Sequence, residues 1–271
     1  MGSLTPVPDQ ETPTGEVVPG PAPPPDPSPA TPRVAASDID LIPWDHDSAE
    51  HHARLLAQRK ACGWRTDEMD EWGRLSREGS KTFYWIRDIL AKHAARFPHE
   101  SAPILDTAAS AWGLPRQPPP PPPPPDRSPR SFVPVGHFAL VRSRPEEEAR
   151  IGLAGQRAAW VCHLYVSWAL QSFGLGKAGM LRLEDEARAP PLEAPVIALD
   201  TMPAEYQMRP DLIEKLYIQQ GNPAPRMSNQ HWYERLGYET FFHEQGAYLW
   251  LNPATGQKEP IDVAYLKKVL K

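Results

Sequence analysis

Alternating and continuous apolar runs divide the chain into expected strands and helices. A period of two indicates a half-buried strand, a short continuous apolar run a fully buried strand, and steps of three and four a helix. Strands are expected at 38–44, 81–88, 132–142, 160–166, 195–202, 238–244 and 247–252, the last two paired with each other. Helices are expected at 48–62, from Thr66, at 89–97, 178–187, 210–219, 228–236 and 261–271. Strands and helices interleaved in this way predict an α/β (α+β) fold.

Two of the expected helices have recognisable ends, and a third depends on spacing alone. Gly63 and Gly237 follow the helices at 48–62 and 228–236, where a left-handed residue is the usual stop signal. For the C-terminal helix, Ile261, Tyr265 and Val269 share one face at steps of four.

Proline divides the chain into a body and two unusual segments. The 35 prolines among 271 residues are concentrated at 6–32 and 115–134. Residues 1–37 have almost no large apolar side chains and are expected to form a disordered tail. The unbroken tract Pro118–Pro125 would form a stiff polyproline II rod that cannot enter a sheet. We therefore expect one domain at 38–271, with an exposed proline-rich insertion at about 98–131 between the second and third strands.

Charge and cysteine content exclude several classes of function. A net charge of −5 gives no electrostatic reason to expect binding to nucleic acid or to a membrane. The two cysteines, Cys62 and Cys162, show no metal-ligand spacing, so we expect reduced core thiols and no metal site. Neither a signal-like apolar segment at the N-terminus nor a long apolar run is evident, which favours a cytoplasmic or nuclear protein.

Residues 159–187 form the unit with the strongest chemical signal. A buried strand is followed by a loop bearing Gly174 and Gly176, and then by a helix. The first turn of a helix has unbonded N–H groups and the positive end of the helix dipole. Glycine lets a phosphate approach those groups closely, so the unit predicts an anion site. The alternative is a strand-helix junction in which the glycines serve packing only.

Gln171-Ser172-Phe173-Gly174-Leu175-Gly176 fits the Q/R-x-x-G-x-G/A signature, and Leu164-Tyr165-Val166 fits the preceding L-x-V. On these residues the chain resembles the GNAT superfamily of N-acetyltransferases, and in general look the uncharacterised GNAT-domain proteins of filamentous fungi. The resemblance implies a mixed, splayed central sheet of about six to seven strands flanked by helices. It also implies that the loop holds the pyrophosphate of acetyl-CoA while backbone groups of 164–166 bond its pantetheine arm. Lys177 is a candidate contact to a phosphate of coenzyme A; the alternative is a solvated surface lysine.

A second match lies downstream. Trp232-Tyr233-Glu234-Arg235-Leu236-Gly237-Tyr238 resembles the family's F-Y-E-K-L-G-F. The resemblance implies that Tyr233 gives its hydroxyl proton to the sulfur of coenzyme A; the alternative is a packing tyrosine. Asn229 is a candidate contact to coenzyme A, because Arg226 stands at the position where many members have the contacting asparagine. Asn229 is also an expected N-cap of the helix that carries Tyr233. Trp168 replaces the family's proline after its L-x-V-x.

The base that would accept the amine proton is less defined. His163 has a side chain whose pKa lies near neutrality, and it lies in the strand beside the expected thioester. Strict alternation would place it on the face opposite Cys162 and Leu164. Asp200 and a chain of waters are alternative bases, and the other interpretation of His163, which the position in a strand favours, is a core residue without a catalytic role.

Together these patterns predict an acetyl-CoA-dependent N-acetyltransferase that acts on an unidentified amine-bearing small molecule or peptide. Two other classes remain open. One is an acyl-CoA-binding regulator without catalysis. The other is a scaffold whose proline tracts bind SH3 or WW modules.

Overall fold

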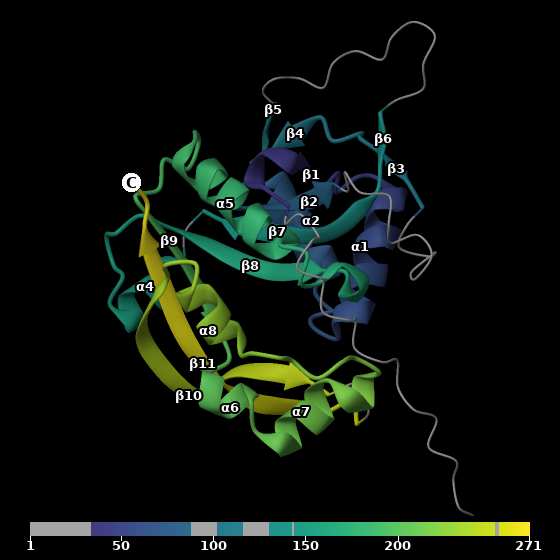
Figure 1. The fold of residues 1–271 in the computed structure, drawn as a ribbon. Helices are drawn as coiled ribbons and strands as arrows, with labels where there is room; N and C mark the ends of the chain where they lie inside the picture. The colour runs from purple at the N-terminus through teal and green to yellow at the C-terminus, as the bar shows by residue number, and fades with distance from the viewer. Residues whose placement is uncertain (1–33, 88–101, 116–129, 143, 253–254) are drawn as a thin grey trace, which may run out of the picture.

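A seven-stranded mixed sheet forms the centre of the molecule (Figure 1). The computed structural model describes residues 34–87, 102–115, 130–142, 144–252 and 255–271. The strand order is β1-β2-β7-β8-β9-β11-β10. Neighbours are antiparallel except β8 and β9, which run parallel. The predicted fold class, a mixed and splayed sheet of six to seven strands flanked by helices, is confirmed.

The strands of the central sheet have the following bounds: β1 Leu41–Pro43, β2 Lys81–Arg87, β7 Pro134–Val141, β8 Ala158–Val166, β9 Val196–Thr201, β10 Glu239–Leu251 and β11 Lys258–Val269. Two small two-stranded sheets, β3–β6 and β4–β5, lie between β2 and β7 in sequence: β3 Ile104–Leu105, β4 Ser110–Ala111, β5 Leu114–Pro115 and β6 Ser131–Phe132. The α-helices are α1 Ala49–Cys62, α2 Met69–Arg77, α4 Pro145–Ile151, α5 Leu175–Arg188, α6 Ala204–Gln207, α7 Pro210–Leu216 and α8 Asn229–Glu234.

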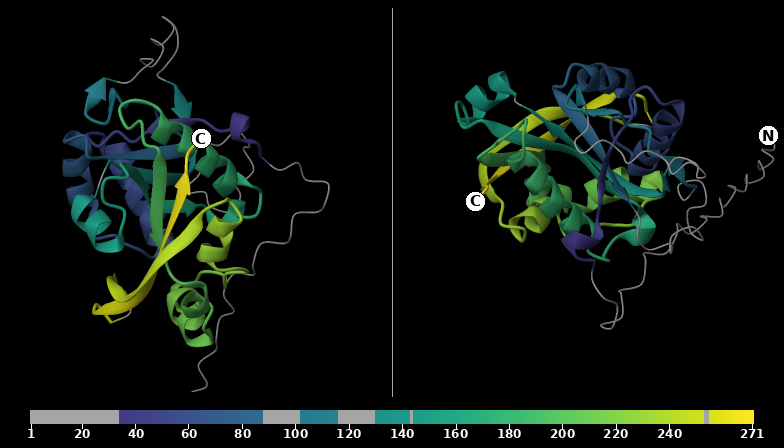
Figure 2. Two further views of the ribbon diagram at one scale, coloured as in Figure 1. Left: turned by 90° about the vertical axis from the view of Figure 1, so that its left-hand side faces the viewer. Right: turned by 90° about the horizontal axis from the view of Figure 1, so that it is seen from above.

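Helices cover both faces of the sheet (Figures 1 and 2). The buried side chains on the two faces of β2 belong to two different cores. On one face α5 packs against β7, β8 and β9 through Leu183 and Met180. On the other face Leu55 of α1 and Trp72 of α2 pack against Phe83 of β2. Strands buried on both faces read as continuous apolar runs, which is why 160–166 shows no clean alternation.

Helix α5 lies unusually close to the sheet because Gly179 has no side chain. A Cβ atom at Gly179 would lie 2.4 Å from Cζ of Phe138 in β7. This contact holds the start of α5 against the sheet near the end of β8, and so helps to place the glycine loop.

The predicted C-terminal helix at 261–271 is wrong. Residues Lys258–Val269 form β11, which pairs with both β9 and β10. Ile261, Val263 and Tyr265 are buried on one face, and Ala264 and Leu266 on the other. A strand buried on both faces places apolar residues at many spacings, including the i, i+4 spacing of a helix.

The expected hairpin of 238–244 with 247–252 is also wrong. Glu239–Leu251 is one long strand, β10, whose partner is β11. Gly246, with φ of 62°, lies at a register shift between Glu244 and Tyr248 and does not form a hairpin turn. Its backbone N–H donates to Asp262 Oδ1 at 2.8 Å, so the irregularity is bonded to β11.

Parts of the expected tail and insertion belong to the folded body. Val34 of the predicted disordered segment packs against the core, and its N–H donates to the carbonyl of Phe173. Trp112 is only 5% exposed and donates from Nε1 to Tyr84 Oη at 3.0 Å. Residues 1–33, the expected helix at 89–97 and the tract Pro118–Pro125 lie outside the described residues.

The remaining differences are local. The short helix α4, ended by Gly152 with φ of 81°, has no counterpart among the predicted elements. The helix expected from Thr66 starts at Met69. Among the residues that the structure describes, no helix is long and apolar enough to cross a bilayer.

Candidate functional site

The parallel strands β8 and β9 separate after four paired residues. They pair from Ala158 and Val196 up to Val161 and Leu199. Beyond that point β8 continues to Val166 and pairs only with β7, while β9 pairs only with β11. The edge of β8 from Cys162 to Val166 therefore faces no strand in the described part of the chain. An extended ligand with amide groups could bond to such an edge as an added strand does.

A β-bulge at His163 changes the direction of the side chains along this edge. Two residues of β8, His163 and Leu164, lie between the pairs Ala139–Cys162 and His137–Tyr165, where β7 contributes only Phe138. His163 has a φ of 56°. Its ring contacts Trp72 and Phe83, on the face where Cys162 also packs. The expectation that His163 lies opposite Cys162 is therefore wrong, because the extra residue breaks the alternation.

The N-terminus of α5 follows directly and has no capping side chain. Gly174 is the N-cap residue, with φ of 93° in the left-handed region. The first described hydrogen bond of the helix is from the Ala178 N–H to the Gly174 carbonyl at 2.9 Å. The N–H groups of Leu175, Gly176 and Lys177 precede it, and no side chain caps them. Three such donors at the positive end of the helix dipole form a favourable site for a phosphate group.

The residues of the predicted signature fall into distinct positions around this helix start. Gln171 ties the loop to the strand by donating from Nε2 to the Val166 carbonyl at 3.4 Å. Ser172, with φ of 73°, and Lys177 are exposed to solvent. Leu175 is buried in the core, and Phe173 is half-buried. Only the exposed members and the backbone are free to meet a ligand.

Gly176 lies against Trp232 of α8. A Cβ atom at Gly176 would be 3.2 Å from Cζ2 of Trp232 and 3.9 Å from Cγ2 of Val166. The packing role that the sequence left open therefore applies to Gly176, whereas Gly174 is needed for its backbone conformation. Trp232 was not a predicted site residue. It stands beside the α5 N-terminus and the end of β8, where a ligand that joins the two would pass.

Tyr233 lies on the buried side of α8. It packs against Tyr238 at 5.8 Å between ring centroids and is 7% exposed. Burial raises its pKa well above the ordinary value for tyrosine, and the charges of Asp200 and Cys162 raise it further. Cys162 and Asp200 directly follow Val161 and Leu199, the last residues that pair β8 with β9. Tyr233 therefore lies near the point where these two strands separate. Its hydroxyl keeps its proton at neutral pH.

Asn229 is exposed and is not the N-cap of α8. Ser228 occupies that position, and its Oγ accepts from the His231 N–H at 3.2 Å. The backbone N–H of Asn229 donates to Gln207 Oε1 at 2.7 Å. The expectation of an Asn229 cap was wrong by one residue because both side chains are good caps.

His163 is joined to Lys81, a residue that the sequence analysis did not single out. Nε2 of His163 lies 3.1 Å from Nζ of Lys81, the first residue of β2. Burial lowers the pKa of His163 well below 6.5, and the positive charges of Lys81, Arg59 and Arg65 lower it further. His163 is therefore neutral at neutral pH. Its partner is 82 positions away in sequence, and no local motif marks the contact.

Asp200, the alternative base, forms an ion pair. Its Oδ1 accepts from Arg144 Nη1 at 3.2 Å, and both side chains are 31% exposed. Arg144 also lies over the ring of Trp160 and pairs with Glu147 at 2.7 Å. The pair forms part of the rim of the site.

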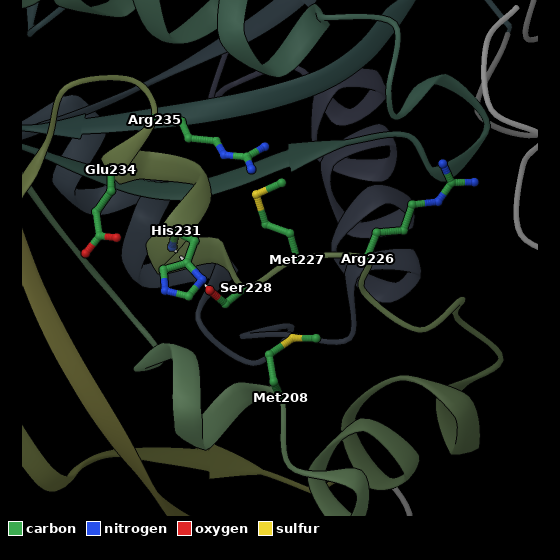
Figure 3. Close-up of a pocket in the computed structure, with 7 residues that line it drawn as sticks. All are labelled: Met208, Arg226, Met227, Ser228, His231, Glu234 and Arg235. Atoms are coloured by element: carbon green, nitrogen blue, oxygen red, sulfur yellow. Dashed lines mark hydrogen bonds between the residues drawn. The ribbon is translucent and has the colours of Figure 1, made fainter.

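A hollow lies beside α8 (Figure 3), and Tyr233 is not among its lining residues. It is open, measures about 650 Å³, and is lined by residues of α8 and the segment before it and by one residue after α6: Met208, Arg226, Met227, Ser228, His231, Glu234 and Arg235. Arg226, at the position where the sequence resemblance would expect an asparagine, is therefore one of the residues that line this hollow. Among the described residues, no three His, Cys, Asp or Glu side chains are grouped to hold a metal ion.

No family model and no curated protein matches the chain. Solved structures align with most of it at low identity. An aminoglycoside 6'-N-acetyltransferase complexed with coenzyme A aligns with TM-score 0.46 and 12% identity, over 86% of this chain and 97% of that chain. NAA60 of Arabidopsis thaliana in complex with acetyl-CoA aligns with TM-score 0.48 and 10% identity, over 86% and 98%. The spermidine/spermine N-acetyltransferase SpeG from Vibrio cholerae aligns with TM-score 0.45 and 12% identity, over 87% and 94%.

Proposed function

We propose that the protein is an acetyl-CoA-dependent N-acetyltransferase of the GNAT superfamily. The observation that carries the proposal is the succession of two backbone surfaces along the chain. The edge of β8 from Cys162 to Val166 faces no strand among the described residues, and the N-terminus of α5, which has no capping side chain, begins nine residues later at Leu175. Acetyl-CoA has the complementary groups in the same order, an amide-bearing arm and a pyrophosphate.

The residues that would hold the cosubstrate follow from this geometry. Backbone groups of Leu164, Tyr165 and Val166 would bond the arm, and the N–H groups of Leu175, Gly176 and Lys177 the pyrophosphate. The charged amine of Lys177 lies exposed on the first turn and adds an electrostatic attraction. Trp232 would line the passage between the two parts.

Tyr233 is the proposed general acid. Its buried hydroxyl remains protonated and lies near Cys162 and Asp200, where the strands separate. The thiolate that leaves during acetyl transfer needs a proton, and a positioned tyrosine can supply it. The neutral imidazole of His163 lies on the same edge, but its Nε2 is already engaged with Lys81. We therefore assign His163 to positioning Lys81.

Binding and turnover test the proposal separately. Acetyl-CoA should raise the melting temperature of the protein, since a ligand that binds only the native state stabilises it. Release of free thiol should then follow when an amine is supplied from a panel of amino acids, polyamines, aminoglycosides and peptide N-termini. No melting shift at saturating acetyl-CoA would contradict the assignment. Binding without thiol release would favour the acyl-CoA-binding regulator.

A further inference from the structure

Two buried cations lie beside the proposed reaction site without a carboxylate partner. Arg59 is 2% exposed and Lys81 is 8% exposed. They lie over the ring of Trp72 at 5.7 and 5.6 Å, and the ring of His163 is 4.4 Å from the same tryptophan. Arg59 donates to the Trp64 carbonyl, and Lys81 contacts His163. Neither forms an ion pair with any residue that the structure describes.

The other charges nearby do not compensate for this excess. Arg65 is paired with Glu68 at 2.9 Å and lies over the ring of Tyr248. Arg144 is paired with Asp200 and Glu147. The carboxylates of Glu68, Glu147 and Asp200 are held by Arg65 and Arg144, and none of the three forms an ion pair with Lys81 or Arg59.

A buried cation without an anion is costly, because burial removes its hydration. The pKa of Lys81 is lowered, chiefly by burial and further by the positive charges of Arg65 and Arg144, while Cys162 and Glu68 act in the opposite direction. An anion bound beside Lys81 would offset the free-energy cost of burying its positive charge. The same surplus of positive charge would repel a second positive group on a ligand.

The residues around the cluster are partly exposed to solvent. The side chains of Arg65, Arg144 and Asp200 are 29%, 31% and 31% exposed and form the rim of the cluster, and the charges of Arg65 and Arg144 act on Lys81. Cys162 and His163, at the free edge of β8, are only partly buried. A small ligand that enters past this rim would meet Lys81 and the reaction site together.

We propose that the acceptor is a small amine that also carries a carboxylate, such as an α-amino acid, and that Lys81 binds this carboxylate with Arg65 or Arg144 beside it. This inference rests on the proposed function and names the substrate class of the same site. In the transfer, a bond forms from the amine nitrogen to the acetyl carbon while the carbon–sulfur bond breaks. The acceptor ammonium loses two protons, of which one ends on the thiol of coenzyme A and one in solvent.

The experiment compares kcat/KM for the common amino acids, for their C-terminal amides and for polyamines, with the full-length chain and saturating acetyl-CoA. We expect the best acceptor to be a free amino acid, preferred over its own amide by about tenfold or more. A preference for the amide or for a polyamine would overturn the inference. So would the absence of transfer to every amino acid by a protein that binds acetyl-CoA, whereas failure to bind acetyl-CoA would overturn the proposed function itself.

The variant Lys81→Met has a side chain of similar length without the charge. It tests whether Lys81 causes the preference for the free amino acid over its amide. It should raise KM for the amino acid and abolish the difference between acid and amide, while the melting shift with acetyl-CoA persists as evidence of folding. Lys81→Arg should retain part of the preference. Lys60→Met, on the exposed end of α1, is the matched control and should behave as wild type. An equal loss of activity on acid and amide in Lys81→Met would show that Lys81 acts as a base, and would overturn the inference.

Discussion

Val161 of β8 lies opposite Leu199 of β9, and this is the last pair of residues that joins the two strands. Cys162 and Asp200, which come next, have different neighbours. The first faces Ala139 in β7, and the second faces Tyr265 in β11. Because the strands separate there, one edge of β8 faces no strand of the described chain although it lies within the sheet rather than at its outer edge. The proposed cosubstrate and acceptor sites meet at this point.

Reversing the charge of Lys177 should weaken acetyl-CoA binding. Lys177→Glu places a negative charge on the first turn of α5, where a phosphate would lie, and the side chain is exposed, so the fold should persist. We expect a Kd about tenfold higher by calorimetry. Lys60→Glu, an exposed lysine on α1, should leave Kd unchanged. Equal Kd values for wild type and Lys177→Glu would argue against a phosphate at this helix start.

Tyr233→Phe should slow turnover and leave acetyl-CoA affinity nearly unchanged. The ring keeps its packing against Tyr238, and only the hydroxyl is lost. A general acid contributes about 10²–10⁴-fold, so single-turnover measurements should show a fall of that order. Tyr206→Phe removes a more exposed hydroxyl near Pro260 and serves as the control. If the Phe variant at 233 matches wild type in a single turnover, Tyr233 is a packing residue.

Gly179→Ala should destabilise the fold. The new methyl group would lie 2.4 Å from Cζ of Phe138, and overpacking of this kind costs about 1–3 kcal/mol, against a gain of about 1 kcal/mol in helix propensity. Phe138→Leu in the same chain should recover part of the loss. Gly73→Ala in α2, where the nearest atom is 3.8 Å away, should instead stabilise by about 0.5–1 kcal/mol. Urea denaturation measures all four proteins. A neutral Gly179→Ala would mean that α5 can move away from the sheet.

His137 should make the protein less stable in mild acid. It is fully buried, and burial lowers its pKa well below 6.5. Below about pH 6.5 the unfolded chain binds a proton at this position and the native state does not, so the free energy of unfolding falls by up to about 1.4 kcal/mol per pH unit. Above that pH neither state is protonated, and the effect vanishes.

The variant His137→Asn tests this dependence. Its amide N–H₂ can replace the Nδ1 contact to Gln58 Oε1, which is 2.8 Å long, but it does not titrate. Urea denaturation between pH 7.5 and pH 5 should give a shallower loss of stability in the variant than in wild type. A residual slope is expected from His163, whose pKa is lowered in the same direction. Identical slopes would contradict a neutral, buried His137.

Replacing 116–129 by a short flexible linker should leave the melting temperature and acetyl-CoA affinity unchanged. The described flanks carry the structural contacts. Phe132 is 4% exposed and packs in the core below α1, and Leu114–Pro115 pairs with Ser110–Ala111. Phe132→Ala, in contrast, should cost about 3–5 kcal/mol. Loss of acetyl-CoA binding in the folded deletion variant would place the replaced segment in the site.

Local sequence patterns determined the elements whose signals are contained within a few residues. The buried run at 160–166, the loop with Gly174 and Gly176 and the helix after it are found nearly as predicted, at Ala158–Val166 and Leu175–Arg188. Gly63 ends α1 with φ of 79°, and Gly237 follows α8 with φ of 87°. In each case the glycine signal and the apolar period agree, so neighbouring residues alone decide the conformation.

Only the tertiary structure decided the features that depend on distant partners. The segment 261–269 has spacing compatible with helix or strand, and it became β11 because β9 and β10 offer it hydrogen bonds on both sides. His163 turned to the face of Cys162 because one extra residue is accommodated against Phe138 in β7. Lys81 meets His163 across 82 positions, and Arg59 shares Trp72 with both. Strand pairing, bulge position and charge balance arise from contacts between segments far apart in the chain, and the residues near each one in sequence do not encode them.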